Sequence, residues 1–227
     1  MSEEVQALPI MPSSKAMILI LGLVATVSGL LVVIAYKMTL PLIEENKRIA
    51  IEQAVFQVVP GASQRKDFVL VGDQLYKATD KKTDDGMSVY VAYDGNGELK
   101  GIAAEAAAQG YANIIRLLYG YDPDCQCITG IKVIKLSETP GLGDKIITDE
   151  EFVANFNHLD ARLDSSGTAL ANPIVTVKHG TKTQPWEIDA ISGATISSRA
   201  VGKALNQSAQ MFLPGLATHV EKLKAEN

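Results

Sequence analysis

The chain has 227 residues, of which 47% are hydrophobic and 21% charged, and its formal net charge is −5. This composition allows a packed core and excludes an intrinsically disordered chain, and it lacks the basic excess typical of a nucleic-acid-binding protein. The mean hydropathy of +0.10 is high for a soluble domain, and one N-terminal segment accounts for it.

That segment is an uncharged apolar run at 16–35, flanked by Lys15 and Lys37. Its length at about 1.5 Å rise per residue matches the roughly 30 Å hydrocarbon core of a bilayer. A buried core helix and a cleaved signal peptide are the alternatives. The run is longer than a typical signal-peptide core, and no small-residue cleavage pattern follows it. We therefore predict an uncleaved transmembrane helix at 15–37 that anchors the chain in a lipid bilayer.

The basic residues around the span leave its orientation open. Lys37, Lys47 and Arg48 follow the span and Lys15 precedes it, which by the positive-inside rule places the globular part in the cytoplasm. This bias rests on few residues, and the rule weakens when a large domain is translocated.

The remaining pattern divides the chain into an N-terminal tail, the span, a helical connector, a main domain and a C-terminal tail, with boundaries 1–14, 15–37, 38–62, 63–213 and 214–227. In the main domain we predict strands at 68–71, 75–76, 88–93, 99–105, 128–136 and 174–178, and helices at 149–156 and 197–212. Asp94-Gly-Asn-Gly97 is a strong turn signal between two strands. This order predicts an α+β fold in which helices pack on a curved antiparallel sheet.

The most informative stretch is DAISGATISS, residues 189–198, a loop of small residues that leads into a helix. Gly193 and Ala194 let another molecule approach the backbone closely, and Thr195 offers a hydroxyl group. Ser197 or Ser198 is the expected cap of the helix. A phosphate at this helix start would meet unpaired N–H groups and the positive end of the helix dipole. The alternative is an ordinary capped helix start.

A second loop, SETPGLGDKI at 137–146, follows a predicted strand and has Gly141 and Gly143 on either side of Leu142. Such a loop can lie against a flat ligand, although a tight turn without a ligand is the alternative. Tyr111, in the segment GYANII, can stack on an aromatic ligand or serve as a core or rim residue.

The two cysteines, Cys125 and Cys127, are too few for a disulfide framework or a four-thiolate zinc site. A bridge between residues i and i+2 is geometrically awkward, so two free loop thiols are favoured over a metal half-site or a redox pair. The three histidines show no catalytic partner pattern and are expected to be surface or capping residues; they are His158, His179 and His219.

Together, these motifs resemble one protein family. DAISGAT matches the recognition sequence D-x-x-(S/T)-G-A-(T/S), at which a flavin transferase attaches FMN to the final hydroxyl, and SETPGLGDKI resembles the companion loop of the same domain. A chain that has this anchor followed by both motifs in this order is similar to the G subunit of the Rnf electron transport complex. The C subunit of the sodium-pumping NADH:quinone reductase has the same plan and is the alternative. The resemblance covers nearly the whole chain after the N-terminal tail.

The resemblance implies covalent FMN on Thr195 through a phosphoester. It implies that the transferase recognises Asp189 and that the cofactor is also contacted by two loops and one aromatic residue, namely Ser192, Gly193, Ala194, Thr139, Gly141, Leu142, Gly143 and Tyr111. No catalytic residue of the chain's own and no metal site are expected, and the chain is expected to turn over no substrate independently.

The resemblance also implies partners and a location. The partners are the flavin transferase during maturation and the other membrane, iron–sulfur and flavin subunits of a complex that couples ferredoxin–NAD electron transfer to Na⁺ or H⁺ transport. The location is the bacterial cytoplasmic membrane, with the FMN domain on the periplasmic side, opposite to the side that the basic residues favour.

Three other functions remain as alternatives from the residues alone. The chain can be a membrane-tethered module that binds a phosphorylated ligand non-covalently, a hydrolase that uses Thr195 or Ser197, or a structural assembly protein without a cofactor.

Overall fold

The structure is a computed structural model that describes residues 13–78 and 86–225. Most of the predicted N-terminal tail therefore lies outside the described residues. The helices are α1 (Ser14–Val58), α2 (Lys145–Thr148), α3 (Glu150–Ala154), α4 (Thr195–Ala217) and α5 (Val220–Ala225). The strands are β1 (Gln64–Val71), β2 (Gln74–Lys77), β3 (Met87–Tyr93), β4 (Leu99–Gln109), β5 (Ile114–Asp122), β6 (Cys127–Lys135), β7 (Leu159–Asp160), β8 (Val175–Val177) and β9 (Glu187–Asp189).

Helix α1 has 45 residues and includes the predicted span. Among the described residues, α1 is the one helix that is long and apolar enough to cross a membrane, and no part of its most apolar stretch is buried. Pro41 lies inside the helix, which continues beyond the apolar run as the pattern of apolar residues predicted. The large apolar side chains of this stretch are exposed, as expected of a segment whose solvent is lipid.

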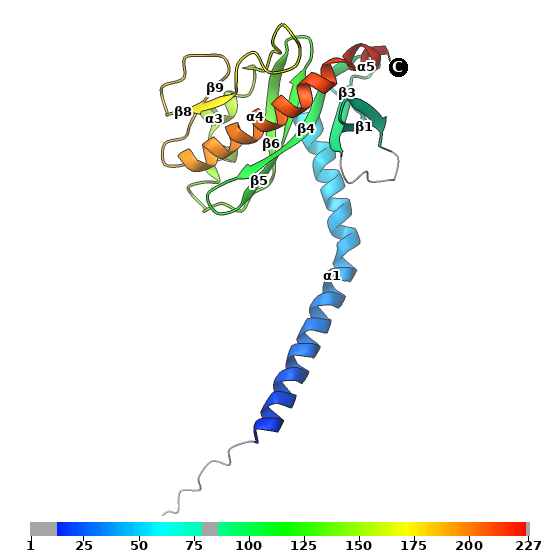
Figure 1. Cartoon of the computed structure of the whole chain (residues 1–227), viewed down its shortest axis with the longest axis vertical. Helices are drawn as coiled ribbons and strands as arrows, with labels where there is room; N and C mark the ends of the chain where they lie inside the picture. The colour runs from blue at the N-terminus through cyan, green and yellow to red at the C-terminus, as the bar shows by residue number, and fades with distance from the viewer. Residues whose placement is uncertain (1–12, 79–85, 226–227) are drawn as a thin grey trace, which may run out of the picture. The chain divides into compact units, whose positions relative to one another are not determined.

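The chain forms two compact units, residues 1–48 and 49–227. The second unit is built on a seven-stranded antiparallel sheet with the order β2-β1-β3-β4-β5-β6-β7, and β8 and β9 form a separate parallel pair. The expected α+β class with an antiparallel sheet is confirmed. Figure 1 shows α4 lying across one face of this sheet, with β8 and β9 beside its N-terminal half.

Both faces of the central strands are buried. On β3, Val89, Val91 and Tyr93 point into the core that contains α4, and Tyr90 and Ala92 point into a second core under the end of α1. This alternation follows from the period of two in a β-strand. The sheet is thus covered by a helix on each side, α4 on one face and the end of α1 on the other.

Several elements differ from the prediction. The long strand β5 was not predicted, because its run of buried residues has no polar alternation. The predicted helix 149–156 is α3, and the Asp149 side chain caps it by accepting a hydrogen bond from the Phe152 N–H at 2.9 Å. Helix α4 begins at Thr195, two residues before the predicted start. Near the C-terminus, Leu223 of α5 is buried and its carbonyl accepts a hydrogen bond from Tyr93.

Candidate functional site

A cavity of about 410 Å³ opens at the N-terminal end of α4. Three segments that are distant in the sequence meet there: the turn between β4 and β5, the loop after β6, and the start of α4. The predicted site residues that line this cavity are Tyr111, Thr139, Leu142, Gly143, Gly193, Ala194 and Thr195. Its volume lies within the range of small-molecule sites, about 300–1,000 Å³.

Thr195 is the first residue of α4 and is half-buried at the cavity wall. The N-cap position is Ala194, which makes no side-chain capping hydrogen bond. Gly193 precedes it with a φ of 82°, a left-handed conformation that glycine adopts without strain. The first N–H groups of a helix have no partner inside the helix, so an uncapped start leaves them available to a ligand.

The expectation that Ser197 or Ser198 caps this helix is wrong, because both residues lie inside it. The Ser198 hydroxyl accepts a hydrogen bond from the Ile191 N–H at 3.1 Å and donates one to the Ala194 carbonyl at 2.9 Å. The Ser197 hydroxyl donates to the Glu138 carboxylate at 2.5 Å. The serines therefore hold the loop before the helix and leave the helix terminus itself uncapped.

Glu138 joins the three segments of the site. Its carboxylate accepts hydrogen bonds from the N–H groups of Tyr111 (3.2 Å), Ala112 (3.0 Å) and Asn113 (3.4 Å), in addition to the Ser197 hydroxyl. Burial raises the pKa of Glu138, but the Ser197 hydroxyl and the three N–H groups together hold it below the ordinary value. The side chain is thus an ionised clamp between the β4–β5 turn and α4.

Gly143 lies directly against this clamp. A Cβ atom at this position would stand 2.7 Å from the Glu138 Cβ and 2.8 Å from the Ser197 Oγ. These distances are shorter than real carbon contacts, so only glycine lets the loop after β6 approach the helix this closely. The second glycine of the predicted loop motif therefore has a packing reason.

The rim of the cavity is apolar. Tyr111, Leu142 and Ile196 line it, and their exposed fractions are 69%, 50% and 53%. Three large apolar side chains grouped around a hydroxyl and an uncapped helix start form a surface that suits a flat ring with a phosphate tail.

Two predicted residues line a different cavity. Asp189 and Ser192 belong to a neighbouring pocket of about 280 Å³, with Lys145, Asn155 and His179 among its lining residues. The Asp189 Oδ2 accepts a hydrogen bond from the Gly180 N–H at 2.9 Å, whereas Oδ1 is buried and has no hydrogen-bond partner among the described residues. Gly141 lines neither cavity; it forms the turn before Leu142 with a φ of 77°.

Three lining residues were not among the predicted binding residues, namely Glu138, Ile196 and Ser197, the last of which was expected only as a helix cap or a hydrolase residue. Glu138 belongs to the SETPGLGDKI segment, and its acidic character between a strand and a glycine loop was the available signal. Ile196 follows Thr195 immediately and is exposed. The amphipathic pattern of a helix does not require an apolar residue on its exposed side, and this was the available signal.

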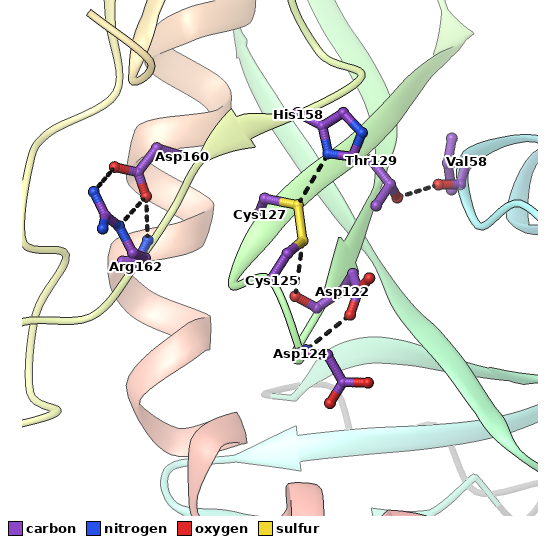
Figure 2. Close-up of a disulfide and its surroundings, with 9 residues drawn as sticks. All are labelled: Val58, Asp122, Asp124, Cys125, Cys127, Thr129, His158, Asp160 and Arg162. Atoms are coloured by element: carbon purple, nitrogen blue, oxygen red, sulfur yellow. Dashed lines mark hydrogen bonds and ion pairs between the residues drawn. A yellow bond between two sulfur atoms is a disulfide. The ribbon is translucent and has the colours of Figure 1, made fainter.

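The prediction of two free thiols is wrong, because Cys125 and Cys127 form a disulfide. The exposed His158 points at this pair, as Figure 2 shows. The other two histidines bond to backbone carbonyls: His179 Nδ1 lies 3.1 Å from the Ala190 oxygen and His219 Nε2 lies 2.8 Å from the Asp73 oxygen. None of the three lines the cavity at Thr195.

The fold and the site define a class of protein, a domain of the FMN-binding type behind an N-terminal apolar helix. Residues 110–210, which contain both loop motifs, match the family model described as FMN-binding domain. The solved structure of Shewanella oneidensis NqrC shares this fold, with a TM-score of 0.62 and 21% sequence identity over 80% of this chain and 100% of that chain.

Sequence similarity to known proteins identifies the family within this class. The G subunit of the ion-translocating oxidoreductase complex of Aliivibrio fischeri strain MJ11 is 34% identical over 214 residues, covering 90% of this chain and 91% of that protein. The G subunit of the Na(+)-translocating ferredoxin:NAD(+) oxidoreductase complex of Acetobacterium woodii is 32% identical over 70% of this chain and 68% of that protein. The corresponding G subunit of Methanosarcina acetivorans is 39% identical, over 55% of this chain and 60% of that protein. The chain belongs to the family of G subunits of ion-translocating oxidoreductase complexes, and it is membrane-anchored.

Proposed function

We propose that this protein carries FMN, joined to Thr195 through a phosphoester, and relays electrons inside an ion-translocating membrane complex. One observation carries the proposal: the Thr195 hydroxyl lies at an uncapped helix start, in a cavity lined by both loops of the recognised motifs. FMN supplies the redox chemistry when it is bound, and the protein supplies binding, orientation and local electrostatics.

The start of α4 suits the phosphate. The N–H groups of the first turn and the positive end of a 23-residue helix favour a negatively charged group beside Thr195. A Cβ atom at Gly193 would meet nothing within 4 Å, so the backbone there is open to a ligand. A phosphoester at Thr195 thus keeps its remaining charge in a favourable field.

The apolar rim suits the ring. Tyr111 and Ile196 present apolar surface on opposite segments, and the Thr139–Gly143 loop offers a compact turn in which the Thr139 carbonyl accepts from Leu142 and Gly143. These groups bind the flat isoalloxazine system, shield it from water and fix its direction relative to the protein. A fixed direction matters because electron transfer falls steeply with distance.

The type of complex is inferred from the names of the relatives. The Acetobacterium woodii relative belongs by name to a Na⁺-translocating ferredoxin:NAD⁺ oxidoreductase complex. We propose that this chain serves a complex of the same type, coupling ferredoxin–NAD electron transfer to Na⁺ or H⁺ transport, with iron–sulfur and flavin subunits as its neighbours.

We also propose a periplasmic position for the domain. The two cysteines of the chain are bridged, and disulfides persist mainly in oxidising compartments such as the bacterial periplasm. This outweighs the small excess of basic residues after the span. Covalent attachment is useful there, because it retains the cofactor in a compartment without a flavin supply.

The test is co-expression of the full-length chain with a flavin transferase, followed by in-gel fluorescence of the denatured chain and intact mass. The wild type is expected to fluoresce and to gain the mass of one FMN phosphoester, and Thr195→Ser is expected to retain part of the signal. Thr195→Ala should be dark. The matched control is Thr218→Ala, which removes a threonine hydroxyl at the other end of α4 and should fluoresce like the wild type.

Two outcomes contradict the proposal. Flavin that survives denaturation in Thr195→Ala places the bond elsewhere. A dark wild-type chain of unmodified mass, despite an active transferase, favours a module that holds a phosphorylated ligand without a covalent bond.

A further inference from the structure

The tip of the β5–β6 hairpin carries a cluster of metal-ligating side chains that the electron-transfer function does not use. Cys125 and Cys127 are joined by a disulfide across this turn, and the Nδ1 atom of His158 lies 3.7 Å from the Cys127 Sγ (Figure 2). The two sulfur atoms and one ring nitrogen all lie within 4.8 Å of one another.

The spacing of these atoms matches a tetrahedral metal site. With metal–sulfur bonds of about 2.3 Å and metal–nitrogen bonds of about 2.0–2.1 Å, the ligand atoms of a tetrahedral zinc site stand roughly 3.5–3.8 Å apart. The Sγ–Nδ1 distance of 3.7 Å between Cys127 and His158 is already of that size. Only the two sulfur atoms, which are bonded to each other, must separate to make room for an ion.

The sheet holds two of the three ligands in place. Cys127 is the buried first residue of β6 and pairs with Asp160 of β7, while His158 immediately precedes β7. The third ligand, Cys125, is exposed in the turn and can move when the bridge opens. A fixed pair with one mobile thiol is therefore able to accept an ion without rearranging the sheet.

The disulfide between Cys125 and Cys127 has features of a bridge that can be reduced. It encloses a single residue, Gln126, which has a φ of 51° and is the one residue other than glycine with a positive φ among those described. Such a conformation is strained for a residue with a side chain. A ring this short also restricts the unfolded chain little, so it contributes little of the usual disulfide stabilisation. The exposed Cys125 sulfur is accessible to an attacking thiolate.

The surroundings favour a cation. Asp122 at the end of β5 and Asp124 in the turn precede the pair, and Lys224 forms an ion pair with Asp124 at 2.9 Å, so these three side chains leave one net negative charge beside the cysteines. Two thiolates and one imidazole are ligands for zinc and similar soft or borderline ions, whereas magnesium and calcium prefer oxygen ligands.

We propose that Cys125, Cys127 and His158 form a redox-gated site for one zinc-class cation, closed while the cysteines are bridged and open when they are reduced. A dithiol reductant opens it by thiol–disulfide exchange: one of its thiolates attacks the Cys125 sulfur, the Cys127 thiolate leaves, and the second thiolate of the reductant resolves the mixed disulfide. The bridge gains two electrons and two protons, and the reductant becomes a disulfide. Metal binding then displaces the two thiol protons, and the neutral imidazole adds its Nδ1 lone pair.

The experiment uses the full-length chain in detergent, as isolated and after reduction with a phosphine that is removed under argon. Because the sequence has two cysteines, alkylation and intact mass count this pair alone. We expect no alkylation as isolated, two alkyl groups after reduction, and protection of both when one equivalent of Zn²⁺ is added first. Calorimetric titration with Zn²⁺ should give one site in the reduced chain and none in the oxidised chain, and Co²⁺ should produce the visible bands of tetrahedral thiolate coordination.

Variants identify the ligands. Loss of one ligand should weaken Zn²⁺ binding at least about tenfold, since changes that merely surround a ligand already cost 10–100-fold. We expect this in Cys125→Ser and His158→Ala, whereas His219→Ala, a histidine outside the cluster, should bind like the wild type. A reduced chain that binds no metal, a His158→Ala variant that binds as tightly as the wild type, or equal weakening in His219→Ala overturns the proposal and leaves the bridge as a structural disulfide.

Discussion

The Glu138 carboxylate accepts a hydrogen bond from the Ser197 hydroxyl at 2.5 Å, across 59 positions of the sequence. The same carboxylate receives the N–H groups of the turn at Tyr111 to Asn113. One side chain thus holds together the three segments that line the cavity at Thr195.

Replacing Glu138 with alanine should loosen the cavity without removing any group proposed to bond to FMN. The variant loses four hydrogen bonds, and we expect the free energy of unfolding to fall by about 1–3 kcal/mol. Covalent flavin per chain should fall as well. Glu138→Gln, which keeps one acceptor oxygen, should lose less of both.

Thermal unfolding in detergent followed by circular dichroism, together with flavin absorbance per chain, measures these effects. The matched control is Glu98→Ala, because the Glu98 side chain is 71% exposed at a turn remote from the cavity lining. If Glu138→Ala unfolds and takes up flavin like Glu98→Ala, the clamp has no role.

The clamp should depend on pH with a definite sign. The pKa of Glu138 is lowered in the folded protein, so its stabilising effect is complete above the ordinary value of 4.5 and is lost as the pH falls through the lowered pKa. The difference in melting temperature between the wild type and Glu138→Gln should therefore be constant near neutral pH and shrink below 4.5. A difference that grows on acidification would show that the carboxyl is held in its protonated form.

Gly143→Ala should disturb the same clamp from the other side. The new methyl group would lie 2.7 Å from the Glu138 Cβ and Oε2, so the loop after β6 must move away from α4. Overpacking of this kind costs about 1–3 kcal/mol, and we expect a lower melting temperature and less covalent flavin. Gly95→Ala is the control, since its Cβ would meet nothing closer than 3.9 Å. Equal melting temperatures for the two variants would refute the steric argument.

Asp189→Asn should slow the attachment of flavin more than it changes the fold. The Asp189 side chain is 26% exposed in a pocket beside the Thr195 cavity, and we propose that the transferase contacts its carboxylate there. Loss of one charge-assisted hydrogen bond, about 1.5–3 kcal/mol, corresponds to roughly a tenfold to hundredfold lower initial rate.

The rate is measured by sampling in-gel fluorescence over time with purified transferase. Asp73→Asn, an acid outside both cavities, is the control. An unchanged rate in Asp189→Asn removes Asp189 from the recognition site. If the slower rate is accompanied by a lower melting temperature than that of Asp73→Asn, Asp189 has a structural role instead.

The sequence was most informative where one local pattern sufficed. The apolar run predicted the N-terminal helix, because membrane-spanning length is a property of consecutive residues. Asp94 predicted its turn, and its carboxylate accepts hydrogen bonds from the Asn96 and Glu98 N–H groups. The two glycine-containing motifs predicted the loops that the structure brings to one cavity, since small residues at fixed spacing can be recognised from the sequence alone.

No local pattern predicted strand β5 or the first residue of α4. Strand β5 lies in the middle of the sheet with helices on both sides, so burial of both faces removes the alternation that marks a strand. Ser197 resembles a helix cap in the sequence. Its hydroxyl instead bonds to Glu138, a residue that only the folded chain brings within reach.

What the sequence determined by itself is therefore the anchor, the α+β class and the identity of the two loop motifs, all of which depend on composition and short-range spacing. The tertiary structure alone decided that Glu138 organises the site, that Asp189 and Thr195 lie in separate pockets, and that His158 approaches the bridged cysteines. The contacts of Glu138 and of His158 join residues 25 or more positions apart. Strand register and helix packing create such contacts, and no local pattern encodes them.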